Sequence, residues 1–260
     1  GVESGQLWKL GEHRLICGDC TDKAVVDRVM GENSISLVVT SPPYDNGESY
    51  EKGDNREDWQ NLINGMIRES TNCLMDGGYF SINMGNRVGF NNIGYCGNVL
   101  ENNDLTFLRR VVWKKPDGAG IPSHGHTHKN PIGLNWHPMM ITEDILIYYK
   151  NNRREPVKSE LFDTDLFRDY YTDCWQFSGV VSDKKQGHPA AFPELLPKLL
   201  ISFLSISNDI IYEPFNGSGT TLIACERLGR KCRAVEISPA YVAVAIQRWV
   251  DVTGGVPELL

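Results

Sequence analysis

The sequence predicts an α/β fold with a doubly wound, mostly parallel sheet and an irregular insertion. Two observations support this prediction. Residues 36–40 and 209–212 are short runs rich in Leu, Ile and Val, which is typical of strands buried on both faces. Each run leads into turn-forming residues, and helical patterns separate such runs along the chain, as in βαβ units. We therefore expect the polar residues after the strands to meet at one edge of the sheet, where such folds bind ligands.

Length and composition favour one domain that covers residues 1–260. The chain has a formal net charge of −7, seven cysteines and no apolar run long enough to span a membrane. Cys17 and Cys20 form the only close pair, so we expect reduced thiols in a cytoplasmic protein rather than a structural metal site. Residues 1–5 lack the pattern of a signal peptide, and we interpret them as a linker remnant.

Apolar spacing and turn-forming residues assign the elements in order. We expect strands at residues 13–20, 36–40, 79–84, 108–113, 141–149, 209–212 and 232–236. Thr21 or Asp22 is a candidate cap for a first helix that runs to Met30.

Three longer helical patterns follow. Residues 59–75 keep apolar side chains at helical spacing, and Asp76-Gly77-Gly78 is expected to end this helix. Another apolar helix is expected at residues 192–204, with Pro193 in its first turn, and a third at residues 222–228.

The stretch Thr40-Ser41-Pro42-Pro43-Tyr44 is the first candidate site. Each proline fixes its own φ angle and lacks an N–H group, so the segment forms a stiff turn whose carbonyl groups have no helix to join. A hydroxyl group precedes the prolines and an aromatic ring follows them. This arrangement favours recognition of a planar molecule that carries an NH₂ group, although an ordinary turn at the end of a strand has the same pattern.

The second candidate site is the turn that contains Gly217 and Gly219. Glycines let a ligand approach the backbone closely. The next predicted strand ends in Glu236, 19 positions after Gly217 (236 − 217), where an acid can accept both hydrogen bonds of a ribose diol. The turn lacks the third glycine of the dinucleotide fingerprint. The sequence therefore predicts a Rossmann-like site for a nucleoside with a small, uncharged or zwitterionic tail.

Two segments between these sites, residues 117–137 and 151–185, have no clear period. The middle third of the chain, which contains both, is the only part with a net positive charge. In the second segment basic and aromatic residues alternate, which suits nucleic-acid contact and equally suits a loop packed on the domain. His124, His126 and His128 alternate in the first segment, but a loop with surface histidines is favoured over a metal site because no Cys or carboxylate shares their spacing.

Together these motifs resemble the amino-methylating DNA methyltransferases that use S-adenosylmethionine. The catalytic strand precedes the cofactor strand, which resembles their circularly permuted β class and implies the corresponding methyltransferase fold. Further matches follow in the family's order: Gly18-Asp19, Val112-Trp113-Lys114, Glu143-Asp144-Ile145-Leu146, His188-Pro189-Ala190-Ala191-Phe192-Pro193 and Ala234-Val235-Glu236-Ile237.

The resemblance implies a role for each matching residue. The residues that would hold the target base are Ser41, Pro42, Pro43 and Tyr44. The cofactor-binding residues would be Asp19, Cys20, Phe192, Pro193, Glu213, Phe215, Gly217, Ser218, Gly219, Thr220 and Glu236. Glu236 would hold the ribose, and Asp19 and Cys20 would lie at the adenine edge. Phe215, Gly217 and Gly219 would wrap the methionine half, and Phe192 and Pro193 would flank the methionine tail. Glu213 departs from the family, which usually has Asp at that position.

The resemblance also implies the reaction and the partners. The protein would methylate the exocyclic amine of a flipped base in double-stranded DNA, with residues 117–137 and 151–185 as target-recognition segments. Serine at position 41 is commoner among enzymes that make N4-methylcytosine, and adenine N6 is the alternative. The resemblance implies a cytoplasmic protein of prokaryotic or phage-like origin that does not bind a membrane. It also implies that the protein can form a homodimer and can have a restriction endonuclease as its partner.

Three other interpretations stay open at this point. A nicotinamide-dependent oxidoreductase would share the glycine turn and Glu236, but it has no use for Ser-Pro-Pro-Tyr. A methylase of RNA or of protein amide nitrogen would share both motifs, and the basic and aromatic segment favours DNA over these acceptors. A DNA-binding module without catalysis would not need both motifs intact.

Overall fold

The computed structural model describes residues 1–260 except residues 33, 45–55, 87–89, 117–140, 156–163 and 179–192. The described residues contain a ten-stranded sheet with the strand order β10-β1-β2-β9-β8-β3-β4-β6-β5-β7. The strands are β1 (Leu7–Leu10), β2 (His13–Cys17), β3 (Ile35–Thr40), β4 (Leu74–Met84), β5 (Leu105–Lys114), β6 (Thr142–Lys150), β7 (Cys174–Gln176), β8 (Ile210–Glu213), β9 (Lys231–Glu236) and β10 (Glu258–Leu259). The helices are α1 (Lys23–Met30), α2 (Arg56–Cys73), α3 (Asn92–Glu101), α4 (Thr164–Tyr170), α5 (Leu195–Leu204), α6 (Thr220–Leu228) and α7 (Pro239–Thr253).

The middle of the sheet is parallel, and each flank contains antiparallel pairs, with the edge strand β7 parallel to β5. Neighbouring strands β2, β9, β8, β3 and β4 run in one direction. On one flank β1 is antiparallel to β2 and β10, and on the other β6 is antiparallel to β4 and β5. The predicted α/β fold with a doubly wound sheet is confirmed, and the carboxyl ends of the five parallel strands share one edge.

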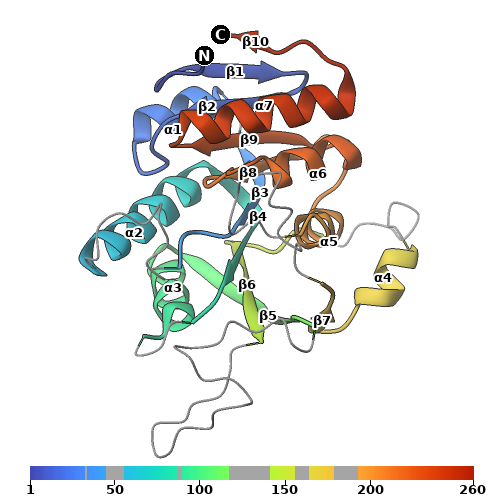
Figure 1. The fold of residues 1–260 in the computed structure, drawn as a ribbon. Coiled ribbons are helices and arrows are strands. Elements are labelled where there is room, and N and C mark those ends of the chain that lie inside the picture. Colours follow the sequence, from blue (N-terminus) through green and yellow to red (C-terminus); the bar gives the residue numbers. More distant parts are fainter. Residues whose placement is uncertain (33, 45–55, 87–89, 117–140, 156–163, 179–192) are drawn as a thin grey trace, which may run out of the picture.

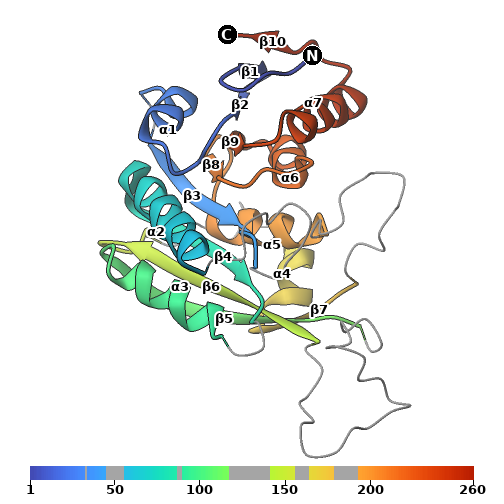
Figure 2. The ribbon, with the colours of Figure 1, turned by 60° about the vertical axis from the view of Figure 1, so that its left-hand side comes forward.

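Helices cover both faces of this sheet. Figures 1 and 2 show α1, α2 and α3 on one side and α5, α6 and α7 on the other. The core is divided in the same way, with Ile63 of α2 in one apolar cluster and Leu199 of α5 in the other. Strand β3 contributes to both, because Val38 points to the first cluster and Val39 to the second. A strand that is buried on both faces explains the continuous apolar run in the sequence.

Helix α2 ends earlier than its apolar spacing predicts. We expected it to continue to Met75, but it ends at Cys73, and Leu74 already pairs with Ile35 as the first residue of β4. Beyond this pair the register between β3 and β4 shifts, and Gly77 lies among the extra residues with a φ of 77°. Pairing with β3 thus overrides the helical spacing. Gly77 adopts the positive φ angle that the irregularity in β4 requires, and it does not end the helix.

The segment at residues 151–185 is less irregular than expected, because it contains α4 and β7. Trp175 of β7 is buried, and its indole N–H donates to the carbonyl oxygen of Tyr170 at 3.0 Å. The ring of Phe177 stacks on Trp113 with a centroid distance of 5.1 Å. For these aromatic residues the alternative interpretation, packing on the domain, is the one that the structure supports.

The apolar helix in the last third also begins later than expected. Helix α5 starts at Leu195 after the N-cap residue Glu194, so Pro193 precedes the helix instead of lying in its first turn. The sequence pattern does not predict α3, α7, β1 or β10. Among the helices of the described ranges, none is long and apolar enough to cross a membrane.

Candidate active site

The two candidate sites lie side by side at the carboxyl edge of the sheet. Strand β3, which leads into residues 41–44, pairs in parallel with β8, which leads into the glycine turn. The hydroxyl group of Thr40 donates a hydrogen bond of 2.8 Å to Glu213, the last residue of β8. The structure therefore joins residues 41–44, the proline corner, to the glycine turn at the ends of adjacent strands.

Side chains from two helices hold the proline corner in place. The indole Nε1 of Trp59 in α2 donates to the carbonyl oxygen of Pro43 at 2.7 Å. The amide Nδ2 of Asn92 in α3 donates to the carbonyl oxygen of Tyr44 at 2.9 Å. None of the described residues donates to the carbonyl oxygen of Pro42. Trp59 and Asn92 thus hold the carbonyl groups of Pro43 and Tyr44, and the Pro42 carbonyl group can still accept a hydrogen bond.

The hydroxyl group of Tyr44 belongs to a hydrogen-bond network. It donates to Glu143 Oε2 at 2.9 Å and lies 2.9 Å from Ser41 Oγ. Asn83 Nδ2 donates to the Tyr44 hydroxyl oxygen and to Glu143 Oε2, both at 2.7 Å. Lys115 forms an ion pair with the other oxygen of Glu143. Tyr44 therefore has a fixed hydroxyl group as well as an aromatic ring.

Sequence reasoning gave Asn83, Glu143 and Lys115 no role, because three separate strands bring them together. Asn83 lies at the end of β4, Glu143 lies at the start of β6, and Lys115 follows β5. Antiparallel pairing of β6 with β4 and β5 places the start of β6 beside the ends of its two neighbours. A polar residue at the end of the buried apolar strand β4 is the signal that could have identified Asn83.

The glycine turn has the backbone conformation that its sequence predicts. Gly217 and Gly219 have φ angles of 51° and 86°, which favour glycine. A Cβ atom on Gly219 would lie 3.0 Å from Cβ of Ala245 in α7. Glycine at position 219 therefore satisfies both the backbone conformation and the close packing of α7 on the turn.

The polar residues of the turn are held by α7. Arg248 Nη1 donates to the carbonyl oxygen of Ser218 at 2.7 Å and to its Oγ at 3.0 Å, and it lies 3.5 Å from Thr220 Oγ1. Ser218 and Thr220 are both buried, whereas Phe215 is half-buried and packs on the core face that α1, α2 and α3 cover. The glycine turn is thus fixed by hydrogen bonds to α7 and lies beside the proline corner.

Glu236 supports the same turn from the next strand. Its Oε2 accepts from the Gly217 N–H at 2.7 Å, and its Oε1 accepts from the Ser238 N–H at 2.8 Å. Burial raises the pKa of this carboxyl group, although these N–H groups favour its charged form. A carboxylate oxygen has two lone pairs, so each oxygen can accept one further hydrogen bond. Glu236 is therefore oriented by the protein and still able to bind a hydroxyl group.

The end of β2 reaches the same place. The Gly18 N–H donates to the Glu236 carbonyl oxygen at 2.9 Å, which puts Asp19 and Cys20 beside the end of β9. Asp19 is exposed, and its Oδ1 accepts from the backbone and hydroxyl groups of Thr21, both at 2.8 Å. Cys20 is buried, and burial raises the pKa of its thiol well above the usual value.

Glu213 occupies the boundary between the two candidate sites. Its carboxyl group accepts hydrogen bonds from the hydroxyl groups of Thr40 and Thr221, both at 2.8 Å, and from the Phe215 N–H at 3.1 Å. Its side chain is completely enclosed, and desolvation raises its pKa to about 8 despite these three donors. This carboxyl group therefore contacts β3, the glycine turn and the start of α6.

Several predicted site residues lie outside the described residues. These are Phe192, the segment at residues 117–137 with its three histidines, and parts of the segment at residues 151–185. Pro193 is described and buried. Within the described ranges, no group of three or more His, Cys, Asp or Glu residues could hold a metal ion.

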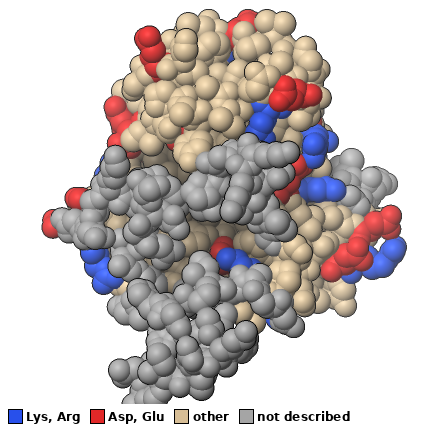
Figure 3. All heavy atoms as spheres, in the orientation of Figure 1, with Lys and Arg blue, Asp and Glu red and all other residues tan. Residues whose placement is uncertain are grey.

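The charged side chains on the face shown in Figure 3 are mixed in sign. Basic and acidic groups are interspersed over the described part of this face, and a hollow near its centre contains both. Much of the middle third of the chain, the only third with a net positive charge, lies outside the described residues.

A family profile defines the class of protein to which this fold and site belong. The profile of the N6_N4_Mtase family, whose description is DNA methylase, matches residues 35–247, and the chain belongs to this family. The matched range contains the proline corner, the glycine turn and Glu236.

Individual relatives agree with this assignment. The type II methyltransferase M.HpaI of Haemophilus parainfluenzae is 27% identical over 244 residues, which cover 91% of this chain and 74% of that protein. The crystal structure of TTHA0409 from Thermus thermophilus, a putative DNA modification methylase complexed with S-adenosyl-L-methionine, superposes with a TM-score of 0.69 at 25% identity and covers 94% of this chain and 98% of that one. The PvuII cytosine-N4-specific DNA methyltransferase has the same fold, with a TM-score of 0.67 at 20% identity and coverage of 92% and 90%.

Proposed function

We propose that this protein transfers a methyl group from S-adenosylmethionine to the exocyclic amine of a base in double-stranded DNA. The observation that carries the proposal is the hydrogen bond from Thr40 to Glu213, which fixes the proline corner against the glycine turn. The end of β3 offers hydrogen-bond acceptors for an amine. The neighbouring end of β8 offers the exposed backbone of the glycine turn, with Glu236 beside it, for a nucleoside. Membership of a DNA methylase family and the likeness to TTHA0409 support the same proposal.

The residues of the glycine turn fit this cofactor. Gly217 and Gly219 expose backbone, and Glu236 can accept the hydrogen bonds of a ribose diol. Asp19 and Cys20 border this space from β2 and are assigned to the adenine edge. Phe192, Pro193, Phe215, Ser218 and Thr220 are assigned to the methionine half, and Glu213 braces the turn. When bound, the cofactor supplies a sulfonium methyl group that is already activated.

The proline corner then has to position the base. An exocyclic amine is a poor nucleophile because its lone pair delocalises into the ring. Hydrogen bonds from the amine to Ser41 Oγ and to the Pro42 carbonyl oxygen direct the lone pair toward the methyl group and stabilise positive charge on nitrogen. Stacking on Tyr44 offsets part of the cost of flipping the base, which is about a few kcal/mol.

We assign cytosine N4 as the target, with adenine N6 as the alternative. Serine before Pro-Pro-Tyr supports cytosine. The same family membership supports both amines. Mass spectrometry of nucleosides from treated DNA distinguishes the two products by their masses and retention times.

We also propose how the protein meets DNA and other partners. The segments at residues 117–137 and 151–185 read the target sequence. Their irregular composition, the basic and aromatic residues of the second segment and their place between the two motifs support this role. Exchange of these segments with those of a relative then changes the methylated site, and an unchanged site contradicts this role. We also propose that the protein belongs to the circularly permuted β class of these methyltransferases. We propose in addition that it forms a homodimer and has a cognate restriction endonuclease.

The first prediction concerns Ser41. We expect Ser41→Ala to bind S-adenosylmethionine within twofold of the wild type by calorimetry. Its transfer of tritiated methyl groups to duplex DNA should fall on the order of 100-fold, because one hydrogen-bond acceptor for the amine is lost. The exposed Ser34→Ala variant is the control and should keep both properties.

Acceptor and cofactor controls test the rival functions. Wild-type protein should methylate duplex DNA, and it should methylate neither RNA nor protein at a comparable rate. Calorimetry should detect binding of S-adenosylmethionine and no binding of NAD. A Ser41→Ala variant that methylates DNA at the wild-type rate contradicts the proposed site.

A further inference from the structure

The carboxylate of Glu143 contacts Tyr44, the residue on which the target base is proposed to stack. Glu143 Oε2 accepts hydrogen bonds from the Tyr44 hydroxyl group at 2.9 Å and from Asn83 Nδ2 at 2.7 Å. Its Oε1 is paired with Lys115. The Glu143 side chain is 12% exposed and the Lys115 side chain 21% exposed, so this ion pair is largely enclosed. The proposed function gives neither residue a role.

The contacts of Glu143 fix the direction of the hydrogen bonds in the network. An ionised carboxylate only accepts hydrogen bonds, so the single proton of the Tyr44 hydroxyl group points to Glu143. An amide NH₂ group only donates, so Asn83 also donates to the Tyr44 oxygen, at 2.7 Å. The 2.9 Å contact between Ser41 Oγ and the Tyr44 oxygen then has one consistent direction, in which Ser41 donates.

This direction determines what Ser41 can offer to a bound base. A serine hydroxyl group has one proton and two lone pairs. With its proton committed to Tyr44, Ser41 Oγ presents lone pairs, and Asn83 Nδ2 makes only a long contact of 3.4 Å to it. An exocyclic amine is a donor toward the corner, so it needs an acceptor there. A serine whose proton pointed at the amine would oppose binding of the NH₂ group.

The ring of Tyr44 is seated closely enough to keep this arrangement. An added Cβ atom on Gly85 would lie 3.3 Å from two ring atoms of Tyr44 and 3.8 Å from Cγ of Glu143. Asn92 holds the Tyr44 carbonyl oxygen from the opposite end of the residue. The hydroxyl group therefore stays within reach of Glu143 and Ser41 together.

We propose that Glu143 is a positioning residue for methyl transfer, which acts through Tyr44 to make Ser41 a hydrogen-bond acceptor for the amine of the target base. This inference rests on the proposed function and deepens it. Serine thereby serves as an acceptor-only group, as a carboxylate at position 41 would. Asn83 completes the network by donating to Tyr44 and Glu143 at once.

A double-mutant cycle tests whether Glu143 acts through Tyr44. The variants are Glu143→Gln, Tyr44→Phe and the pair, and the readout is the single-turnover rate of methyl transfer to duplex DNA. Glu143→Gln should lower this rate about tenfold or more in the wild-type background, because a neutral amide no longer fixes the proton of Tyr44. It should change the rate little in the Tyr44→Phe background. In Glu143→Gln, the affinity for S-adenosylmethionine and the KM for DNA should stay within twofold of the wild type. Its unfolding midpoint should stay within error of the wild-type value.

The ratio of the two losses decides the question. A loss in the wild-type background at least five times the loss in the Tyr44→Phe background upholds the proposal, and any smaller ratio overturns it. If Tyr44→Phe transfers no measurable methyl group, the same ratio is taken in a Ser41→Asp background, which accepts from the amine regardless of Tyr44. A Ser41→Asp protein without activity also overturns the proposal.

Two controls separate this result from other failures. Glu101→Gln is the matched control, because Glu101 Oε1 accepts from the hydroxyl group of Tyr148 at 3.3 Å outside the site. It should leave the rate unchanged. A wild-type protein that methylates no DNA contradicts the proposed function itself, whereas an active wild type with a ratio below five contradicts only the role of Glu143.

Discussion

At the scale of single residues, Glu213 is the side chain on which both halves of the site converge. Its carboxyl group is enclosed, and it accepts from Thr40 of β3 and from Thr221 at the start of α6. Desolvation raises its pKa to about 8, above the usual value of an exposed acid. The folded protein therefore binds a proton that the unfolded chain releases at lower pH.

This shift predicts how stability depends on pH. For an acid whose pKa is raised on folding, the stabilisation is complete below the unfolded pKa, which is 4.5, and is lost as pH rises toward about 8. We expect Glu213 to lower the free energy of unfolding by roughly 3 kcal/mol between pH 5 and pH 8. In Glu213→Gln this dependence should flatten.

Urea denaturation at pH 5, 6.5 and 8 measures the effect. Glu258→Gln, at an exposed position of β10, is the control and should keep the slope of the wild type. An identical slope in wild type and Glu213→Gln shows that Glu213 ionises normally in the folded protein.

Some residues of the site could be predicted from the sequence because they are consecutive in it. Residues 41–44 and the glycine turn stand out as short motifs with a physical meaning for each residue type. Asn83 and Asn92 do not, since each is an ordinary polar residue until β4 and α3 place it beside Tyr44. Glu143 begins one of the matched motifs, but its contact with Tyr44 does not follow from that motif. Contacts of this kind depend on the register between strands, which single-sequence patterns leave open.

At the scale of elements, the glycine turn shows how a sequence pattern and a packing requirement coincide. Gly219 is the N-cap residue of α6 in a left-handed conformation, and α7 packs directly on it. Gly229 ends α6 with a φ of 67° and has no atom within 4 Å of an added Cβ. The two glycines thus share a conformation but differ in their surroundings.

This difference gives a matched pair of variants. Gly229→Ala should cost about 1 kcal/mol of unfolding free energy, because only backbone strain is added. Gly219→Ala should cost about 2–4 kcal/mol, because Ala245 must also move, and it should weaken binding of S-adenosylmethionine at least tenfold. Denaturation and calorimetry measure the two effects. Equal losses in both variants contradict the role of close packing at Gly219.

Some element ends and some whole elements did not follow from the sequence pattern. Apolar spacing correctly indicates α2, but Leu74 leaves the helix because it gains a partner in β3. The basic and aromatic segment similarly contains β7, whose parallel pairing with β5 joins Val112 to Cys174. In both cases a long-range strand partner decides the local structure, and local patterns do not contain that information.

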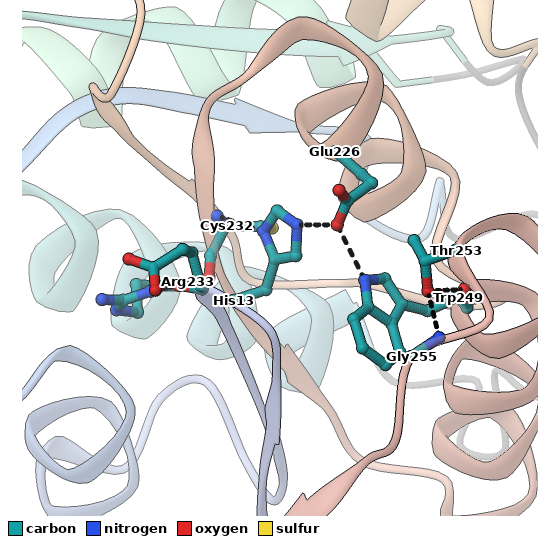
Figure 4. Close-up of polar contacts among 8 residues, drawn as sticks. His13, Glu226, Cys232, Arg233, Trp249, Thr253 and Gly255 are labelled. Atoms are coloured by element: carbon teal, nitrogen blue, oxygen red, sulfur yellow. Dashed lines mark hydrogen bonds and ion pairs between the residues drawn. The ribbon is translucent and has the colours of Figure 1, made fainter.

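At the scale of the whole molecule, a buried histidine joins the first and last parts of the chain (Figure 4). His13 of β2 accepts from the Cys232 N–H at 2.8 Å through Nδ1, and its Nε2 donates to Glu226 Oε2 at 2.9 Å. The same Glu226 oxygen accepts from Trp249 Nε1 of α7 at 2.8 Å. The cluster links β2, β9, α6 and α7, and it requires a neutral imidazole because Nδ1 must accept.

Protonation of His13 should therefore destabilise the fold. Burial lowers the pKa of His13, although Glu226 opposes this shift. For a base whose pKa is lowered on folding, stability is complete above the unfolded pKa of 6.5 and is lost as pH falls. This trend is opposite to that of Glu213, so the two variants separate the two contributions.

We expect His13→Gln to remove this contribution while keeping a donor for Glu226. Its unfolding free energy should be lower than that of the wild type by about 1–3 kcal/mol at pH 7.5. The difference should shrink as pH falls to 5.5. Denaturation at the two pH values measures it. A difference that stays constant contradicts the requirement for a neutral ring.

The antiparallel hairpin of β5 and β6 has a consequence for how such a protein can diversify. The ladder between these strands ends with the pair Lys114 and Thr142, and the Lys115 N–H donates to the Ile141 carbonyl oxygen at 2.8 Å. The chain therefore leaves the sheet and returns to it at two positions that a backbone hydrogen bond joins, next to Glu143. Loop-closure entropy rises only slowly with length, so a longer or shorter connection between these positions costs the sheet little. The strand pairs that place Asn83 and Glu143 beside Tyr44 can therefore persist while the sequence between positions 115 and 141 changes.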